Sequence, residues 1–293
     1  MKTFTETLYD SYGQEFRVDE LLYENKTDHQ HLVIFRNAHF GRVMALDGVI
    51  QTTQKDEFIY HEMVSHLPLL AHGSPARGLI VGGGDGGVVR EVLKHPSVQS
   101  VVLVEIDRAV IDFCREHLPE HSRGGFDDPR LELVIDNGAD YLLKKSDTFD
   151  VIISDGTDPI GPGKDLFSAK FYRLCRKALT PGGLLVAQNG VPFMQLEELV
   201  QTAGHLRDLF RDWHFYTAAI PTYVGGSMAF AWATDNEALR HVRLSDLRSR
   251  YRKAGLTTRY YNPEIHQAAF ALPQYMLEAI GKTDNEYGRD NPS

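Results

Sequence analysis

Val81-Gly82-Gly83-Gly84-Asp85-Gly86-Gly87 is the stretch that decides the fold of this chain. The apolar run 78–81 precedes it, and residues 88–93, which have helical character, follow it. Strand, Gly-rich turn and helix in this order indicate a unit of a doubly wound α/β sheet, because glycine lets the backbone turn tightly and approach a ligand. A Gly-rich run alone can also be an ordinary tight turn, so its surroundings must decide.

Two carboxylates near this stretch point to a nucleoside ligand. The next apolar run, 101–104, ends in Glu105, and an acid about 20 residues beyond such a turn can accept both hydroxyls of a ribose. Asp85 lies inside the turn, where a phosphate-binding loop would present amide groups to the anion. We therefore expect a nucleoside that is not a dinucleotide and that carries a positive group near Asp85.

The chain is long enough for one large α/β domain and a smaller one, and hydrophobic enough for a sizeable core. The chain has 293 residues, 42% of them hydrophobic, and a formal net charge of -9. An acidic chain is unsuited to broad binding of nucleic acid or anionic membranes, so we expect neither partner. Its two cysteines fit no disulfide framework, and its N-terminus lacks the apolar core of a signal peptide. We expect a cytoplasmic protein.

Residues 1–55 are predicted to form a small N-terminal domain of antiparallel β structure, because turn residues separate short apolar runs. A helix is expected to follow, with Asp56 as its N-cap and an end near Pro68, since apolar residues recur there at helical spacing. The candidate strands of the N-terminal domain are residues 16–23, 31–36 and 42–46.

Residues 56–293 are predicted to form a methyltransferase-like Rossmann domain, with a mostly parallel, doubly wound sheet that contains one antiparallel strand. Its first four strands are nearly continuous apolar runs, as expected of parallel strands covered on both faces. Residues 221–226 are too short for a crossover helix, so the two strands that they join should pair antiparallel. Ser168 is the expected N-cap of a helix. The predicted strands are residues 78–82, 100–106, 131–136, 149–154, 182–188, 213–220 and 227–234.

Four carboxylates are predicted to meet at one edge of this sheet. Ligands of doubly wound sheets lie at the carboxyl ends of the strands, and Asp85, Glu105, Asp155 and Asp158 follow such ends. Unpaired like charges raise one another's pKa and cost stability, so a site that gathers them is suited to a cation. The cation can be organic, or a metal such as Mg²⁺ or Ca²⁺.

The histidines do not indicate a transition-metal site. His61 and His66 lie five residues apart on a predicted helix, whereas a zinc-binding helix needs a spacing of four. At a spacing of five the two side chains point about 140° apart around the helix.

Further motifs accompany the Gly-rich turn: Leu46-Asp47-Gly48-Val49-Ile50-Gln51-Thr52, Asp56-Glu57-Phe58-Ile59-Tyr60-His61-Glu62-Met63, Val104-Glu105-Ile106-Asp107 and residues 155–162. Together they resemble the spermidine synthase family of aminopropyltransferases, from about Glu6 to Ala279. The resemblance to the enterobacterial type is particularly close in residues 159–163, 186–190 and 270–275.

The resemblance implies an enzyme and a reaction. The aminopropyl group of decarboxylated S-adenosylmethionine, a co-substrate, would pass to putrescine and give spermidine, 5′-methylthioadenosine and a proton. No metal and no prosthetic group is expected, because a sulfonium is already an activated leaving group. Putrescine is a diammonium ion near pH 7, with pKa values of about 10, and an ammonium cannot attack. Asp155 resembles the family's catalytic base, which would remove one proton before the amine displaces sulfur directly.

The resemblance also implies how the donor is held. Glu105 would bind the ribose hydroxyls, and Asp85 would bind the amine of the aminopropyl arm while repelling the carboxylate of ordinary S-adenosylmethionine. Asn137 and Gly138 would face the edge of the adenine, with Pro162 packing nearby.

Other residues are implied in contacts with the donor or the diamine. Gln30 and His61 would touch one of the two substrates, and Asp158, Tyr60 and Tyr223 would line the diamine channel. The aromatic rings can cover the apolar linker of the diamine, although each tyrosine could instead be a core residue with a satisfied hydroxyl.

Two positions depart from the family pattern. Many relatives have Asp in place of Asn137, so we expect weaker or altered donor binding. Gly156 replaces a Ser or Cys, which we expect to loosen the loop 156–164, a candidate lid over the substrates.

Other functions are compatible with the same sheet. Asp85 argues against a methyltransferase, whose donor carries a carboxylate, and against a nicotinamide oxidoreductase, whose pyrophosphate it would repel. A polyamine-binding protein without activity would be favoured if Asp155 were missing, and it is present. Cadaverine, agmatine or spermidine are alternative acceptors to putrescine. Relatives associate through the N-terminal unit, so we expect a homodimer, or a tetramer.

Overall fold

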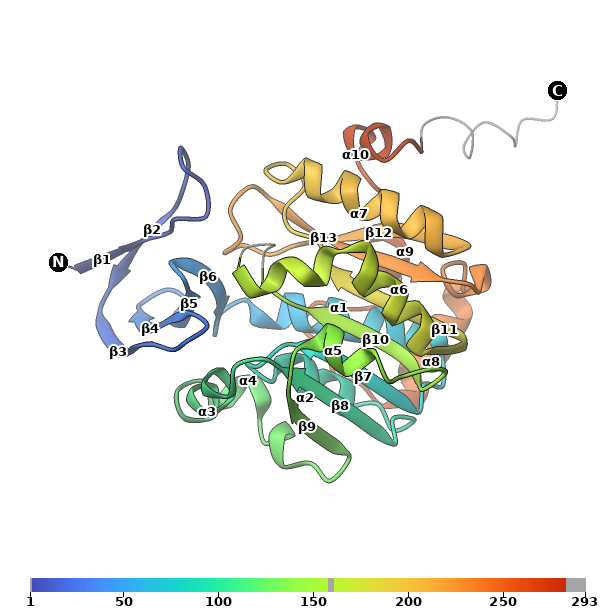
Figure 1. Ribbon diagram of the computed structural model, residues 1–293, viewed down its shortest axis with the longest axis horizontal. Helices are drawn as coiled ribbons and strands as arrows, with labels where there is room; N and C mark the ends of the chain where they lie inside the picture. Colours follow the sequence, from blue (N-terminus) through green and yellow to red (C-terminus); the bar gives the residue numbers. More distant parts are fainter. Residues whose placement is uncertain (1, 158–160, 283–293) are drawn as a thin grey trace.

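The structure, a computed structural model, describes residues 2–157 and 161–282 (Figure 1). The short strands β1 to β6 at the N-terminal end lie to one side of a larger α/β part (Figure 1). β1 (Lys2–Thr5) pairs antiparallel with β2 (Glu15–Val18) in a two-stranded sheet. A second, four-stranded antiparallel sheet has the order β3-β4-β5-β6. Its strands are β3 (Glu20–Lys26), β4 (His31–Asn37), β5 (Gly41–Leu46) and β6 (Val49–Thr53).

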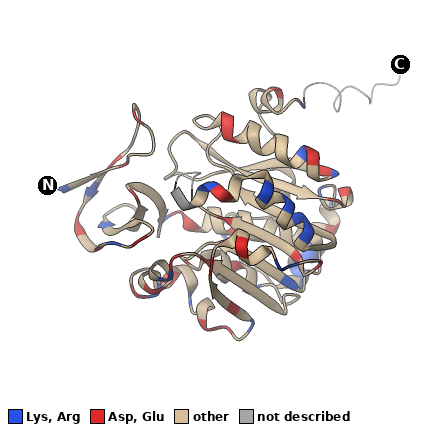
Figure 2. Cartoon of the chain, viewed as in Figure 1, with Lys and Arg blue, Asp and Glu red and all other residues tan. Residues whose placement is uncertain are grey.

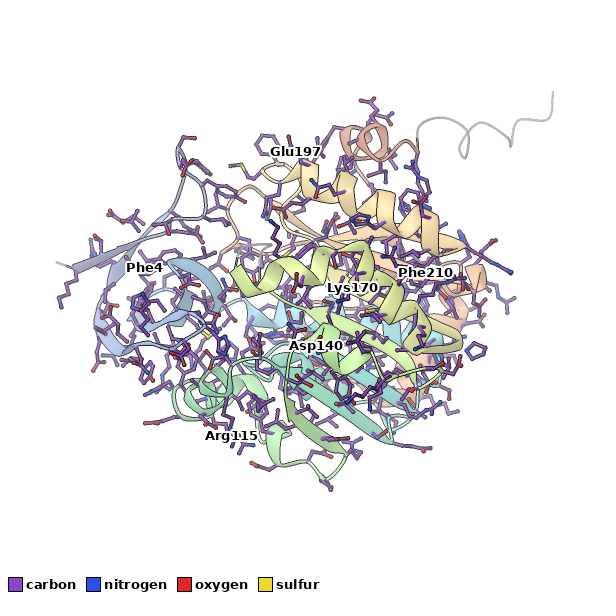
Figure 3. The ribbon with its side chains drawn as sticks, in the orientation of Figure 1. Phe4, Arg115, Asp140, Lys170, Glu197 and Phe210 are labelled. Carbon is purple, nitrogen blue, oxygen red and sulfur yellow. The ribbon has the colours of Figure 1, made fainter. Side chains whose placement is uncertain are left out.

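The prediction of antiparallel β structure at this end is confirmed, but the single predicted strand over 16–23 is wrong. The segment is divided at Asp19 into β2 and β3, which belong to different sheets. The amide of Asp19 donates a hydrogen bond to the carbonyl of Arg36, and β3 begins there along β4. Phe4, labelled in Figure 3, stacks on Phe35 at 5.1 Å between ring centroids and joins the two sheets.

The larger part is built on a seven-stranded sheet with the order β12-β13-β11-β10-β7-β8-β9. The predicted methyltransferase-like arrangement is confirmed: β13 pairs antiparallel with both β11 and β12, and the other neighbouring strands are parallel. The strands are β7 (Arg77–Gly82), β8 (Ser100–Glu105), β9 (Leu131–Ile135), β10 (Phe149–Asp155), β11 (Leu179–Gln188), β12 (Asp212–Ala219) and β13 (Ser227–Thr234).

Helices cover both faces of this sheet, so side chains along a central strand alternate between two cores. On β7, Ile80 enters one core and Leu79 and Val81 enter the other. The first core packs against α1 (Glu57–His72), α2 (Gly87–Leu93), α8 (Leu244–Ala254) and α9 (Pro263–Ala268). The second packs against α5 (Gly138–Leu142), α6 (Ala169–Ala178), α7 (Leu196–Leu209) and α10 (Gln274–Ala279).

Two α-helices lie between β8 and β9 in the chain. They are α3 (Arg108–His117) and α4 (Pro119–Ser122). Lys and Arg gather along the outer face of α6 (Figure 2). Within residues 2–157 and 161–282, no helix is long and apolar enough to cross a membrane.

The C-terminal end of α1 differs from the prediction. The helix does not stop near Pro68 but continues to His72, where Gly73 adopts a left-handed conformation (φ 90°). Proline lacks an amide hydrogen and normally breaks a helix, but here the following residues Leu69 and Leu70 are buried in the core, which offsets that cost. Asp56 occupies the N-cap position without a capping side-chain hydrogen bond. The N-cap predicted at Ser168 is confirmed, since its Oγ accepts from the amide of Phe171 at 3.1 Å.

Candidate active site

The Gly-rich turn after β7 lies directly against the end of β10. Gly82 and Gly83 have φ angles of 82° and 73°. The amide of Gly83 donates a hydrogen bond to the carbonyl of Asp155 at 2.9 Å, and a Cβ on Gly82 would lie 2.2 Å from that same carbonyl oxygen. Only glycine satisfies both the backbone angles and the contact. The turn therefore brings Asp85 close to Asp155.

A cavity of about 360 Å³ opens at this point, between the N-terminal sheet and the carboxyl ends of β7, β8, β9 and β10. Its size falls in the range of small-molecule sites. Nine of the predicted site residues line it together: Gln30, Tyr60, His61, Asp85, Glu105, Asn137, Gly138, Asp155 and Tyr223.

The remaining two predicted site residues cannot be placed in the same way. Asp158 lies outside the described residues. Pro162 belongs to the short helix η2 (Gly161–Phe167), and its side chain also lies outside the described part.

Asp155 ends β10 with its carboxylate in the cavity. The hydroxyl of Tyr60 donates a short hydrogen bond to its Oδ1. Burial, together with the nearby charge of Asp85, raises the pKa of Asp155 to about 6. Tyr60 is itself buried against Phe230, with ring centroids 5.3 Å apart, so its hydroxyl is fixed in place. Asp155 is therefore an oriented carboxylate that is mostly ionised at neutral pH and can accept a proton.

Asp85 is paired inside the protein, which the sequence did not indicate. His61 lies between two carboxylates: Nε2 is 3.2 Å from Oδ2 of Asp85, and Nδ1 is 2.6 Å from Oε2 of Glu57. Burial disfavours a charged ring, but the two carboxylates outweigh it and raise the pKa of His61 to about 10. The charged ring in turn lowers the pKa of Asp85, despite burial. Gly87 leaves room for this ring, because a Cβ there would lie 2.2 Å from Cε1 of His61.

Glu105, at the end of β8, presents a second buried carboxylate. Its Oε1 accepts from the amide of Asp107 at 3.0 Å. Burial raises the pKa of Glu105 to about 7 against the effect of backbone hydrogen bonds. Gln30 reaches the same region from the N-terminal sheet, with Nε2 3.4 Å from Oδ2 of Asp107. The two sheets therefore share this part of the cavity wall.

Asn137 serves the fold as well as the cavity. Its Oδ1 caps α5 by accepting from the amides of Ala139 at 2.8 Å and Asp140 at 3.3 Å. The side-chain oxygen of Asn137, which was expected to face the adenine edge, is thus engaged by the helix, and its amide nitrogen makes neither of these bonds. Gly138 follows with no room for a Cβ, which would lie 2.3 Å from Cγ1 of Val81.

Gly156 also has a packing reason. A Cβ at this position would lie 2.6 Å from Cδ1 of Leu166, a residue of η2 that lines the cavity. The absent side chain therefore makes room for Leu166. This contact was not foreseen from the sequence, which suggested only a looser loop.

Tyr223 lines the cavity with its ring, while its hydroxyl donates to the carbonyl of Gln51 at 2.7 Å. Its neighbour Thr222 is held by Asp56, which accepts from the Thr222 amide at 2.9 Å and from its hydroxyl at 2.6 Å. Sequence reasoning missed this contact, since nothing local links the two segments. It also missed Glu57, although the spacing of four to His61 places the two on one helix face.

Among residues 2–157 and 161–282, no group of three or more His, Cys, Asp or Glu side chains is arranged to hold a metal ion. The cavity wall instead contains carboxylates, aromatic rings and backbone groups, which suit an organic cation.

The fold and the site define the class: an enzyme with a methyltransferase-like Rossmann fold and an acidic cavity at its Gly-rich turn. Residues 57–243 match the family model described as the spermine/spermidine synthase domain. Residues 3–54 match the model described as the spermidine synthase tetramerisation domain.

Curated relatives agree over nearly the whole chain. Polyamine aminopropyltransferase 1 of Pseudomonas aeruginosa is 61% identical over 286 residues, which is 98% of this chain and 100% of the relative. A polyamine aminopropyltransferase of Escherichia coli is 58% identical, over 95% of this chain and 97% of the relative.

Solved structures give the same result. A spermidine synthase in complex with the transition-state analogue AdoDATO has a TM-score of 0.91 and 38% identity, covering 96% of this chain and 95% of that one. The spermidine synthase of Thermotoga maritima has a TM-score of 0.90 and 37% identity, covering 96% and 94%. The chain belongs to the spermine/spermidine synthase family and is an aminopropyltransferase, as its motifs predicted.

Proposed function

We propose that this enzyme transfers the aminopropyl group of decarboxylated S-adenosylmethionine to putrescine. One observation carries the proposal: the described cavity wall contains Asp85, Glu105 and Asp155 but no Lys or Arg. Both substrates are dications at neutral pH, so an acidic wall favours them. The similar spermidine synthase solved in complex with the transition-state analogue AdoDATO supports the same class of reaction.

In this proposal the donor lies across the carboxyl ends of β7, β8 and β9. Glu105 accepts hydrogen bonds from the ribose hydroxyls, and Asp85 accepts them from the ammonium of the aminopropyl arm. Gly138 and Asn137 face the adenine edge, where the amide nitrogen of Asn137 is the better placed group because its oxygen caps α5. Gln30 approaches from the N-terminal sheet, and a contact of Pro162 with the donor is proposed from the sequence pattern alone.

The acceptor lies between Asp155 and the aromatic wall. Tyr60 and Tyr223, whose ring centroids are 6.3 Å apart, cover the apolar linker of putrescine. His61 contributes to the boundary between the two substrates. Asp158 receives the far ammonium, a role proposed from the sequence pattern alone.

Asp155 acts as the general base. It takes a proton from the near ammonium, and the freed amine attacks the methylene next to sulfur. A C–N bond forms as the C–S bond breaks, and the bonding electron pair stays on sulfur, which leaves as the neutral thioether of 5′-methylthioadenosine. General-base help contributes roughly 10²–10⁴-fold, and the alignment of two substrates contributes more.

The test is an assay with two donors, decarboxylated and ordinary S-adenosylmethionine, each with and without putrescine. Mass spectrometry detects spermidine and 5′-methylthioadenosine. We expect product only from the decarboxylated donor with putrescine. Formation of S-adenosylhomocysteine from the ordinary donor with another acceptor would instead indicate a methyltransferase. Cadaverine, agmatine and spermidine as acceptors then define the acceptor range.

We further propose that residues 1–55 and 56–293 act as two domains, and that copies associate through the N-terminal sheets as a homodimer or tetramer in the cytoplasm. The match of residues 3–54 to a tetramerisation domain supports association. Light scattering after size exclusion, with and without residues 2–14, would test the state of assembly.

A further inference from the structure

A row of buried ionisable side chains leads away from the cavity along the contact between α1 and α2. The row consists of Asp85, His61, Glu57, Arg90 and Glu91. Successive members are 3.2, 2.6, 2.7 and 2.6 Å apart, in that order. Lys94, which is 36% exposed, continues it to the surface at 2.6 Å from Glu91.

The members of the row alternate in sign. Each of the five inner side chains is 10% exposed or less. A buried ion without an opposite charge is strongly destabilising, so the state of each member depends on its neighbours. The hydrogen bonds and charges of His61 and Arg90 lower the pKa of Glu57 to about 2, despite burial.

Arg90 anchors the row. Its guanidinium donates two hydrogen bonds to Glu57, from Nη1 to Oε1 at 3.2 Å and from Nη2 to Oε2 at 2.7 Å. Nη1 also donates to the carbonyls of Glu120 at 3.0 Å and His121 at 2.7 Å, on α4. Because several fixed acceptors surround the planar guanidinium, it is held in one orientation. The guanidinium in turn fixes the orientation of the Glu57 carboxylate.

We propose that Glu57 and Arg90 are positioning residues that hold the His61 ring as a two-sided hydrogen-bond donor, so that Asp85 stays a fixed carboxylate for the ammonium of the aminopropyl arm. The role of Asp85 in this statement rests on the proposed function. Glu57 occupies Nδ1 of the ring as an acceptor, and Asp85 faces Nε2, so both nitrogens carry hydrogen. A neutral ring could donate to only one of the two carboxylates.

Few other groups near His61 could keep a proton on both nitrogens of its ring. The ring of His121 lies 6.0 Å away in a T-shaped contact, and burial lowers its pKa, so it is neutral. Asp155 lies beyond Asp85 and senses the charge of His61. Of the groups facing His61 in the described structure, Glu57 is therefore the one that can hold Nδ1.

The first test is made on the free protein by NMR with ¹⁵N-labelled histidine. In the wild type, we expect the His61 ring to keep both protons up to about pH 9. In Glu57→Gln, we expect it to lose one proton near neutral pH. Glu62→Gln is the matched control: Glu62 is a buried carboxylate of the same helix, but it accepts from the amides of Arg259, Tyr260 and Tyr261.

The second test compares two nucleosides that differ in the arm, decarboxylated S-adenosylmethionine and 5′-methylthioadenosine. Calorimetry should show that Glu57→Gln weakens the first about tenfold and the second less than twofold, because only the first has the ammonium that contacts Asp85, and Asp85 is no longer held in place in this variant. Glu62→Gln should leave the ratio unchanged. In a His61→Gln background, Glu57→Gln should add almost nothing, because it acts through that ring.

The proposal fails if the His61 ring titrates alike in the wild type and in Glu57→Gln, or if both nucleosides weaken equally. Arg90→Lys keeps the positive charge but removes the planar guanidinium, and it replaces Glu57→Gln as the test variant if Glu57→Gln does not fold. It should shift the His61 titration and the ratio of the two nucleoside affinities in the same directions as Glu57→Gln. Failure of the proposed function is a different result, namely a wild type that makes no spermidine, and the NMR titration still decides the role of Glu57.

Discussion

The hydroxyl of Tyr60, on α1, donates a hydrogen bond to Oδ1 of Asp155, at the end of β10, across 95 positions of the chain. The contact stabilises the ionised carboxylate, while burial and Asp85 stabilise the protonated form. The balance leaves the pKa of Asp155 at about 6, below physiological pH and far below that of the amine which it would deprotonate in the proposed mechanism.

Replacing Asp155 with Asn should preserve the fold and reduce kcat by about 10²–10⁴-fold, because the base is lost while both substrates can still bind. Steady-state kinetics on the purified variant checks this. Asp150→Asn is the control on the same strand: Asp150 accepts from the amides of Ala76 and Arg77 away from the cavity, so its loss should lower stability with little effect on kcat. Near-normal turnover of Asp155→Asn would exclude it as the base.

The pH profile of kcat/KM should fall on the acid side near pH 6, where Asp155 gains its proton. Tyr60→Phe removes a hydrogen bond that lowers this pKa, so the acid limb should move to higher pH and the rate at neutral pH should drop about tenfold. Tyr216→Phe, which removes a buried hydroxyl bonded to the carbonyl of Met63, should leave the limb in place. If the acid limb of the profile does not move in Tyr60→Phe, the hydrogen bond from Tyr60 does not set the pKa of Asp155.

Asp85→Asn should increase the affinity for ordinary S-adenosylmethionine relative to the decarboxylated donor. In the proposed site, the variant removes a charge that would attract the ammonium of one ligand and repel the carboxylate of the other. Calorimetry with both ligands measures the ratio of dissociation constants. An unchanged ratio would mean that selectivity comes from another group.

Asp56→Ala should destabilise the protein by about 3 kcal/mol, because a buried carboxylate that accepts from Thr53 and Thr222 is removed and the donors lose their partner. Urea denaturation checks this value. The KM for putrescine should rise as well, since Thr222 precedes the cavity-lining Tyr223. Asp246→Ala, at an exposed ion pair with Arg243, should change stability by about 0.5 kcal/mol or less.

Stability should decrease as the pH falls from about 6.5 toward 3. Burial lowers the pKa of His95, His214 and His266 to about 3 each. In that interval the unfolded chain binds their protons and the folded chain does not, so each histidine costs roughly 1.4 kcal/mol per pH unit. Urea denaturation at several pH values measures the slope, and His266→Gln should reduce it. If His266→Gln leaves the slope unchanged, the lowered pKa of His266 is contradicted.

Much of the fold could be predicted because short stretches of sequence specify its strands and their connections. Apolar runs mark the strands of the large sheet, and a short connection at 221–226 implies the antiparallel pair β12–β13. Parallel strands place their carboxyl ends at one edge, so the meeting of Asp85, Glu105 and Asp155 follows from their positions after three strands. The end of α1 was predicted wrongly at Pro68 for a non-local reason. Burial of the next helical turn outweighed the local tendency of proline to end a helix.

The sequence by itself determined the sheet, the Gly-rich turn and the meeting of Asp85, Glu105 and Asp155 at one edge of the sheet, because chain connectivity and strand direction dictate these. Only the tertiary structure decided which side chains pair: His61 between Glu57 and Asp85, Asn137 as a helix cap, and Leu166 in the space beside Gly156. Pair energies and pKa values depend on distances between groups and on their separation from water, and packing sets both.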